Sequence, residues 1–167
     1  YKNPQVQSFQ RFIAITELIR DTFISQYQIP EAKIDIIYPA VDDKQICMVR
    51  KSDISYEAVC DKYGLDKMKK HVSFIARLAE QKNPLRYCKL VKACLENGMT
   101  GIQFIMVGDG PYKDKVDSYL EKNQMQDLIV RIPYVKNVPE FMRVLDALII
   151  TSDFEGMPIV CIEAMSM

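Results

Sequence analysis

The sequence predicts an α/β fold: a Rossmann-like, mainly parallel sheet with helices on both faces. Short, continuously apolar runs such as residues 102–107 recur along the chain, and runs of this kind are typical of strands that are buried on both faces. Between them lie stretches with apolar residues at helical spacing, for example residues 84–95. Strands that alternate with amphipathic helices are joined by crossover connections, which make neighbouring strands parallel.

Composition places the chain among ordinary globular proteins of about one domain. It has 167 residues, 49% of them apolar, and a formal net charge of +0. Neutrality gives no electrostatic case for nucleic acid, and no window has the roughly 18 apolar residues of a membrane span. The five cysteines lack metal-ligand spacing and are expected to be free thiols, and His71, the single histidine, is expected to be structural.

The first part of the chain predicts a strand, a helix and a second strand. Residues 12–15 form a short apolar run, Thr16 can cap the helix that follows, and Pro30 ends that helix. Residues 34–38 are expected to form the second strand. Residues 43–53 are polar and without clear periodicity, which predicts an irregular linker between domains.

The second part predicts the main sheet. The expected strands are residues 71–76, 102–107, 128–132 and 147–150. Local signals mark the helix ends: Gly64 ends a helix, Asn83 caps one with Pro84 at its first position, and Asn137 with Glu140 suggests a capping box.

Two cations follow the first strand of this sheet. Arg77 leaves the strand's carboxyl end, and Lys82 stands five residues later, just before the helix cap. An arginine fork and a lysine charge at such a turn can hold a diphosphate. Two solvated loop charges are the alternative that the residues alone leave open.

The turn Gly108-Asp-Gly-Pro111 follows the next strand. Gly108 and Gly110 indicate a tight turn that needs the conformational freedom of glycine. The turn lacks the third glycine of a dinucleotide-binding fingerprint, which argues against an oxidoreductase.

Two glutamates stand near the end of the chain. Glu155 follows an apolar strand, where open α/β sheets place ligands, and Glu163 falls within a helix that opens near Pro158. A loop charge and a solvated helix residue are the alternative interpretation.

Together these motifs resemble those of the retaining GT-B glycosyltransferases of family 4, the glycosyl transferases group 1. Phe154–Met165 looks like the family's two-glutamate signature. Ile75–Asn83 looks like its Gly-Arg-Leu-x-x-x-Lys-Gly motif, with Ala76 and Asn83 in place of the glycines. Gly108–Pro111 looks like its Gly-x-Gly-Pro turn. The likeness covers the chain from about Phe12 onward, in the family's order.

The resemblance implies roles for these residues. Arg77 and Lys82 would bind the donor diphosphate, and Glu155 would meet the hydroxyls of the donor sugar; these three are the expected catalytic residues. Glu163 would hold the nucleotide ribose. The other expected donor- or nucleotide-binding residues are Gly108, Gly110, Gly156, Met157, Pro158 and Ile159.

The resemblance also implies an organisation and a function. Residues 1–43 would close an N-terminal acceptor domain, and residues 44–167 would form a truncated, incomplete nucleotide-sugar-binding domain. The expected parent enzyme transfers a sugar from a nucleoside-diphosphate donor, with UDP or GDP, to an acceptor hydroxyl with retention of configuration. A non-catalytic nucleotide-binding or interaction module is the alternative.

Further expectations concern cofactors, partners and location. No cofactor or metal is expected, since the two cations would neutralise the diphosphate and no Asp-x-Asp motif occurs. The expected partners are a nucleotide-sugar donor and a glycan or lipid-linked acceptor. The expected location is the cytoplasm, with contact at the inner face of the membrane left open for the parent protein.

Overall fold

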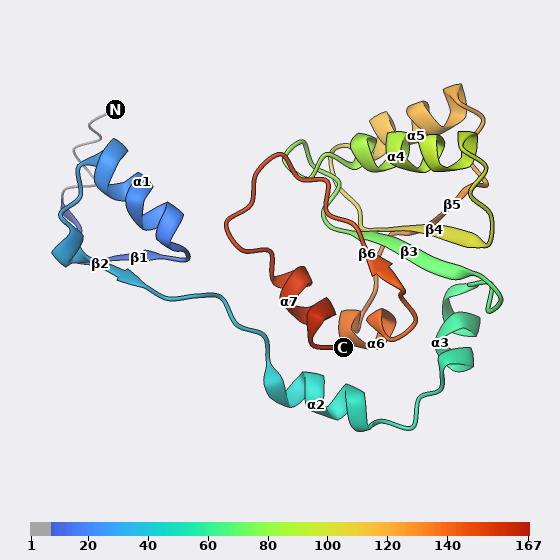
Figure 1. Cartoon of the computed structure of the whole chain (residues 1–167), viewed down its shortest axis with the longest axis horizontal. Helices are drawn as coiled ribbons and strands as arrows, with labels where there is room; N and C mark the ends of the chain where they lie inside the picture. The colour runs from blue at the N-terminus through green and yellow to red at the C-terminus, as the bar shows by residue number, and fades with distance from the viewer. Residues whose placement is uncertain (1–7) are drawn as a thin grey trace. The chain divides into compact units, whose positions relative to one another are not determined.

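The computed structural model describes residues 8–167, which fall into two compact units (Figure 1). The smaller unit contains the described residues up to Val41 together with Glu155–Ile162. The larger unit contains Asp42–Phe154 and Glu163–Met167. The division near Val41 lies close to the boundary expected after residue 43, while the stretch Glu155–Ile162 groups with the smaller unit.

The smaller unit contains the strand–helix–strand block expected from the sequence. This block consists of β1 (Phe12–Ala14), α1 (Glu17–Tyr27), a short 3-10 helix (Glu31–Lys33) and β2 (Ile34–Ile36). The two strands pair in parallel. The hydroxyl of Thr16 accepts a hydrogen bond from the backbone N–H of Ile19 at 3.2 Å, so the predicted helix cap is confirmed.

A four-stranded parallel sheet forms the centre of the larger unit. Its strands are β3 (Lys70–Ile75), β4 (Ile102–Val107), β5 (Ile129–Ile132) and β6 (Ala147–Leu148). Their order across the sheet is β5-β4-β3-β6, and every neighbouring pair is parallel. All four lie within the predicted strands or extend them by one residue, which confirms the predicted fold class.

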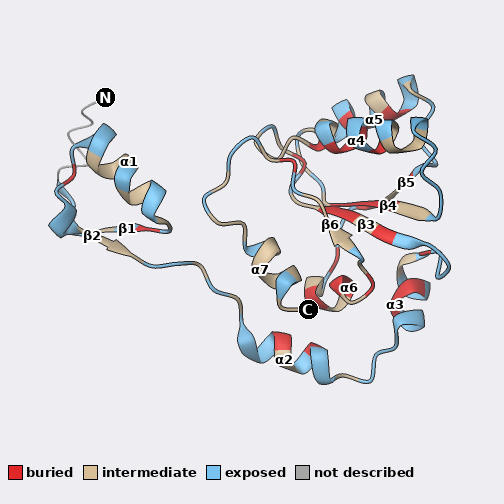
Figure 2. Ribbon diagram, viewed as in Figure 1, coloured by how far each residue is buried: buried red, intermediate tan, exposed pale blue. Residues whose placement is uncertain are grey.

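Helices cover both faces of this sheet (Figure 1). They are α3 (Tyr56–Tyr63), α4 (Pro84–Glu96), α5 (Lys113–Lys122) and α6 (Val138–Met142). Alternate residues of β4 point to opposite faces of the sheet. Phe104 and Met106 belong to the core cluster under α4 and α5, and Ile105 and Val107 belong to the cluster under α3 and α6. Figure 2 shows the buried positions on the strands and on the inward sides of the helices.

One expectation was wrong: residues 43–53 are largely helical. Helix α2 runs over Asp43–Lys51, and a carboxylate oxygen of Asp42 accepts hydrogen bonds from the two backbone N–H groups of its first turn. Ile46 and Val49 are buried, 4% and 6% exposed. These two residues stand at i and i+3, so they lie on one face of the helix, and their burial stabilises it although the stretch is polar overall.

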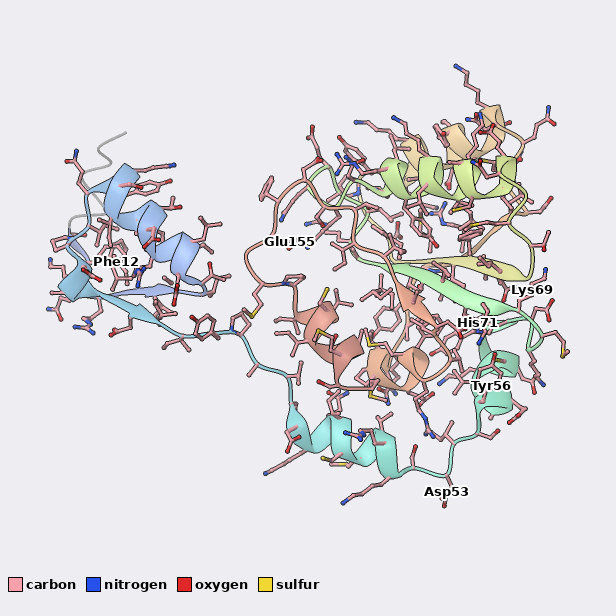
Figure 3. The ribbon with its side chains drawn as sticks, in the orientation of Figure 1. Phe12, Asp53, Tyr56, Lys69, His71 and Glu155 are labelled. Atoms are coloured by element: carbon pink, nitrogen blue, oxygen red, sulfur yellow. The ribbon has the colours of Figure 1, made fainter. Side chains whose placement is uncertain are left out.

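His71 is structural, as expected. The side chain is fully buried, its Nδ1 lies 2.8 Å from the carbonyl oxygen of Val144, and its Nε2 lies 3.0 Å from that of Asp66. The ring of Tyr56 stacks on the imidazole, with centroids 6.1 Å apart (Figure 3). The five cysteines are free thiols, as the sequence predicts.

The strand order creates a switch point between β3 and β6. Helix α4 leads from β3 to β4 on one face of the sheet, whereas the connection from β5 to β6 passes through α6 on the other. The loops that follow β3 and β6 therefore start side by side at the carboxyl edge of the sheet. Open α/β sheets bind their ligands at such points.

Candidate functional site

The loop after β3 carries the two predicted cations. Its buried residue Leu78 is tied to the next loop along the sheet: its N–H donates to the carbonyl oxygen of Asp109 at 2.9 Å, and its carbonyl oxygen accepts from Tyr112 at 2.8 Å. Arg77 is exposed beside this anchor, and Lys82 is half-buried at the far end of the loop. Both cations therefore leave a loop whose backbone is held in place.

The glycine turn after β4 packs directly on that loop. Gly108 and Gly110 have φ of 129° and 154°. A Cβ at Gly108 would overlap the carbonyl oxygen of Ala76, and one at Gly110 would lie 2.6 Å from that of Leu78. The glycines are thus needed at a positive φ, as the sequence predicts, and also for the close approach of two backbones.

Asn83 stands where the motif that this loop resembles has its second glycine, and its conformation explains why the loop does not need glycine there. Its backbone is left-handed, with φ 47° and ψ 58°, a conformation that asparagine tolerates better than most residues. Its side-chain oxygen accepts from the N–H of Arg86 at 3.2 Å, and Pro84 begins the helix. The predicted cap of α4 is therefore confirmed. A glycine would supply the same backbone but not these side-chain bonds.

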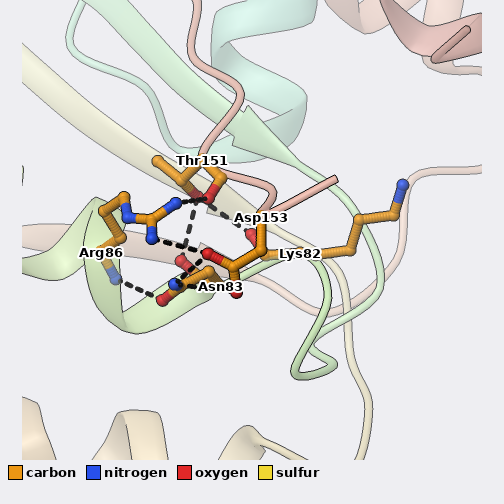
Figure 4. Close-up of polar contacts among 5 residues, drawn as sticks. All are labelled: Lys82, Asn83, Arg86, Thr151 and Asp153. Carbon is orange, nitrogen blue, oxygen red and sulfur yellow. Dashed lines mark hydrogen bonds and ion pairs between the residues drawn. The ribbon is translucent and has the colours of Figure 1, made fainter. Parts of the chain in front are cut away.

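A polar cluster joins this helix start to the segment after β6 (Figure 4). It consists of Asn83, Arg86, Thr151 and Asp153. Arg86 Nη2 lies 2.6 Å from a carboxylate oxygen of Asp153, and Arg86 Nη1 donates to the carbonyl oxygen of Thr151 at 2.8 Å. Asn83 Nδ2 donates to the carboxylate of Asp153 at 3.1 Å. Asn83 first, and then Arg86, hold the pKa of Asp153 below its usual range.

Sequence reasoning missed this cluster. Arg86, Thr151 and Asp153 carry no motif of their own, and the partners lie 65 to 70 residues apart in the chain. The only local signal is the position of Asp153 two residues before Glu155.

The segment that carries Glu155 belongs to the smaller unit. It contains Glu155, Gly156, Met157, Pro158 and Ile159. A Cβ at Gly156 would lie 2.6 Å from Cδ1 of Ile15 and 3.1 Å from that of Ile19. Those atoms are the ends of flexible side chains, so Gly156 lies against the start of α1 without the backbone constraint found at Gly108.

Helix α7 (Ile159–Met165) begins directly after Pro158, as expected for a proline that opens a helix. Glu163 lies on it, belongs to the larger unit and is half-buried. Desolvation by this burial raises the pKa of its carboxyl group. The structure thus brings the Arg77–Lys82 loop against the Gly108–Gly110 turn within one unit, and it assigns Glu155 to Ile159 to the other.

Within residues 8–167 no three His, Cys, Asp or Glu side chains are grouped as metal ligands would be. None of the helices in the same part of the chain is long and apolar enough to cross a bilayer.

Curated relatives of the chain are glycosyltransferases. The Escherichia coli enzyme UDP-Gal:alpha-D-GlcNAc-diphosphoundecaprenol alpha-1,3-galactosyltransferase is 24% identical over 159 residues, which cover 93% of this chain and 40% of that enzyme. The chain therefore spans less than half the length of this relative.

Solved structures agree in fold. WaaG, a glycosyltransferase involved in lipopolysaccharide biosynthesis, superposes with a TM-score of 0.80 at 18% identity, over 92% of this chain and 41% of that one. Anabaena Alr3699/HepE in complex with UDP superposes with a TM-score of 0.76 at 18% identity, over 94% and 42%. These neighbours have the GT-B fold that the sequence predicts.

The model of the family "Glycosyl transferases group 1" matches residues 56–167, which is more than half of the chain. The chain therefore belongs to the group 1 glycosyl transferases.

Proposed function

We propose that this chain is the donor-binding part of a retaining glycosyltransferase, which moves a sugar from a nucleoside-diphosphate donor to an acceptor hydroxyl. The observation that carries the proposal is the pairing of Arg77 and Lys82 on one anchored loop at the carboxyl end of β3. That loop borders the switch point of the sheet, where α/β proteins bind ligands.

In the proposed reaction, the bond between the anomeric carbon of the sugar and the diphosphate oxygen breaks, and the oxygen of the acceptor hydroxyl forms a bond to the same carbon. The proton of that hydroxyl passes to the departing diphosphate. The electron pair of the broken bond remains on the diphosphate, which gains negative charge as it leaves. Arg77 and Lys82 bind its oxygens and stabilise this charge, so they lower the energy of the transition state more than that of the bound donor. On this proposal the two cations take the charge-neutralising role and no metal ion is required.

The proposal also gives a role to each of the two glutamates and to the residues between them. Glu155 orients the sugar through its hydroxyls, while the backbone from Gly156 to Ile159 lies along the donor. Glu163 binds the ribose.

The names of the relatives narrow the substrates. The donor of the E. coli relative is UDP-Gal and its acceptor is linked to diphosphoundecaprenol, and the Anabaena structure holds UDP. We therefore propose a UDP-sugar donor and a lipid-linked bacterial glycan acceptor. We further propose that the parent protein acts at the inner face of the membrane as a peripheral protein, where it would meet an acceptor of that kind.

Calorimetric titration of the 167-residue chain with UDP, GDP and NAD tests donor binding. We expect UDP or GDP to bind and NAD not to bind. Arg77→Ala and Lys82→Ala should each weaken binding. Lys69→Ala is the matched control, because Lys69 is exposed at the amino end of β3, on the opposite edge of the sheet (Figure 3). Equal loss in all three variants would point to nonspecific electrostatics.

Sugar transfer separates the enzyme from a non-catalytic nucleotide-binding module. A protein of the relatives' full length that contains this chain should transfer the sugar. The 167-residue chain alone should not, because both substrates must be aligned, and alignment contributes roughly 7–11 kcal/mol in favourable cases. A longer protein that binds UDP and transfers nothing would favour the module.

A further inference from the structure

The loop after β3 that carries Arg77 and Lys82 is joined to the segment after β6. Three consecutive carbonyl groups of this loop accept hydrogen bonds from that segment. The N–H of Asp153 donates to Gln81 at 2.8 Å. The hydroxyl of Thr151 lies 3.0 Å from the carbonyl oxygens of both Lys82 and Asn83. The backbone from which the Lys82 side chain leaves is therefore held by residues about 70 positions further along the chain.

The side chains of Arg86 and Asp153 hold that segment in turn. Arg86 bonds to both the carbonyl oxygen of Thr151 and the carboxylate of Asp153, so one planar guanidinium fixes two points of the segment. Asn83 adds a third bond, to Asp153. Figure 4 shows these bonds around the start of α4, with the Lys82 side chain extending away from them.

The ion pair between Arg86 and Asp153 itself contributes little to stability. The side chains of Arg86 and Asp153 are 53% and 42% exposed, and ion pairs at such exposure contribute only about 0–1 kcal/mol. Arg86 bonds to the segment after β6. In that segment the N–H of Asp153 and the hydroxyl of Thr151 bond in turn to the backbone at the end of the loop that carries Lys82. A planar guanidinium that bonds to two acceptors adds geometric precision as well as energy.

We propose that Arg86 and Asp153 are positioning residues, which act through the Thr151 and Asn83 contacts to fix Lys82 for its bond with the diphosphate. The inference rests on the proposed donor binding. It adds that the affinity for a nucleoside diphosphate depends on two residues that do not touch it.

A double-mutant cycle on the 167-residue chain, titrated with UDP, tests this inference. The variants are Asp153→Ala, Lys82→Ala and the two combined. Asp153→Ala should weaken UDP binding about three- to tenfold when Lys82 is present and less than about twofold when it is absent. No loss, or the same loss in both backgrounds, would overturn the inference.

Two further variants guard against simple misfolding. Asn83→Gly keeps access to the left-handed backbone and removes only the side-chain bonds, so it should reproduce part of the loss. Asp61→Ala is the matched control, because it breaks an exposed ion pair with the same 2.6 Å separation, to Lys67, on α3 and the loop after it. It should leave UDP binding unchanged.

Hydrogen exchange without ligand separates failure of the inference from failure of the proposed function. In Arg86→Gln the amide of Asp153 should exchange about tenfold faster, while amides of β4 remain protected. Suppose that the amide of Asp153 exchanges faster in Arg86→Gln but the wild type binds no UDP. The proposed donor binding would then be contradicted, while the control of the loop by Arg86 would be supported. Unchanged exchange would overturn the inference whatever UDP does.

Discussion

The hydroxyl group of Thr151 lies 3.0 Å from the carbonyl oxygen of Lys82, so a residue just after β6 holds the backbone of a predicted catalytic residue. The side chain of Thr151 is buried, and the residue is 5% exposed. This contact links the two loops that flank the switch point of the sheet.

Thr151→Val should destabilise the chain by about 1–2 kcal/mol, because it replaces the donor shared by two carbonyl groups with a methyl group. Chemical denaturation monitored by circular dichroism measures the loss. Thr151→Ser keeps the hydroxyl group and should recover most of the stability. If valine and serine cost the same, packing rather than the hydrogen bond is the cause.

Gly108→Ala should destabilise the chain by at least about 3 kcal/mol, since a Cβ there would overlap the backbone of Ala76. Gly98→Ala is the control. Gly98 also has a positive φ, 76°, but nothing lies within 4 Å of a Cβ built there. Only the conformational cost, about 1–2 kcal/mol, is expected for it. Equal losses in denaturant melts would refute the close-approach argument.

Asp153 should make the stability of the chain depend on pH in the acid range. Its pKa is lowered in the folded chain, first by Asn83 and then by Arg86, relative to the usual value of about 3.9. A lowered carboxyl pKa stabilises the folded chain above that value, and the contribution is lost as the pH falls through the folded-state pKa.

The stability difference between the wild type and Asp153→Asn should therefore be constant near neutral pH and shrink below about pH 4. Urea titrations at a series of pH values measure it. In an Arg86→Gln background the pH-dependent difference should be smaller, because one of the two causes is gone. A difference that persists unchanged to low pH would mean that the charge of Asp153 is irrelevant.

In a longer protein that contains this chain, Arg77→Ala and Lys82→Ala should lower kcat more than they raise the donor KM. The charge on the leaving diphosphate is larger in the transition state than in the bound donor. Loss of one such group costs about a hundred- to thousandfold in rate in comparable sites. Steady-state kinetics with varied donor concentration measures both constants.

Glu163→Ala provides the contrast. A ribose contact is equally strong in the bound donor and in the transition state, so its loss should raise KM and leave kcat nearly unchanged. Glu155→Ala should fall between the two classes, because it orients the reacting sugar. The opposite pattern, with kcat lost in Glu163→Ala and only KM changed in Arg77→Ala, would reverse the assigned roles.

Part of the candidate site could be predicted from the sequence because its signals are local. Arg77 and Lys82 were found from their position after an apolar strand, and the Gly108 turn from its glycines. The reason for Gly108, however, includes the carbonyl group of Ala76, which lies 32 residues away in the chain. No pattern within the turn itself contains that contact.

The sequence by itself determined the strands, most of the helices and their caps. Continuous apolar runs must be buried on both faces, and capping side chains act on backbone groups two or three residues away. Such effects operate over a few residues, so they can be predicted from adjacent positions. The caps at Thr16 and Asn83 and the helix end at Gly64 are of this kind.

The tertiary structure decided what depends on distant partners. Helix α2 exists in a polar stretch because Ile46 and Val49 find a buried environment, and Arg143 binds the backbone at the helix's last turn. The contacts of Arg86 with Asp153, and the grouping of Glu155 with the smaller unit, likewise appear only when the chain is folded. Burial and long-range hydrogen bonds depend on which residues meet in space, and the local pattern around each residue does not contain that information.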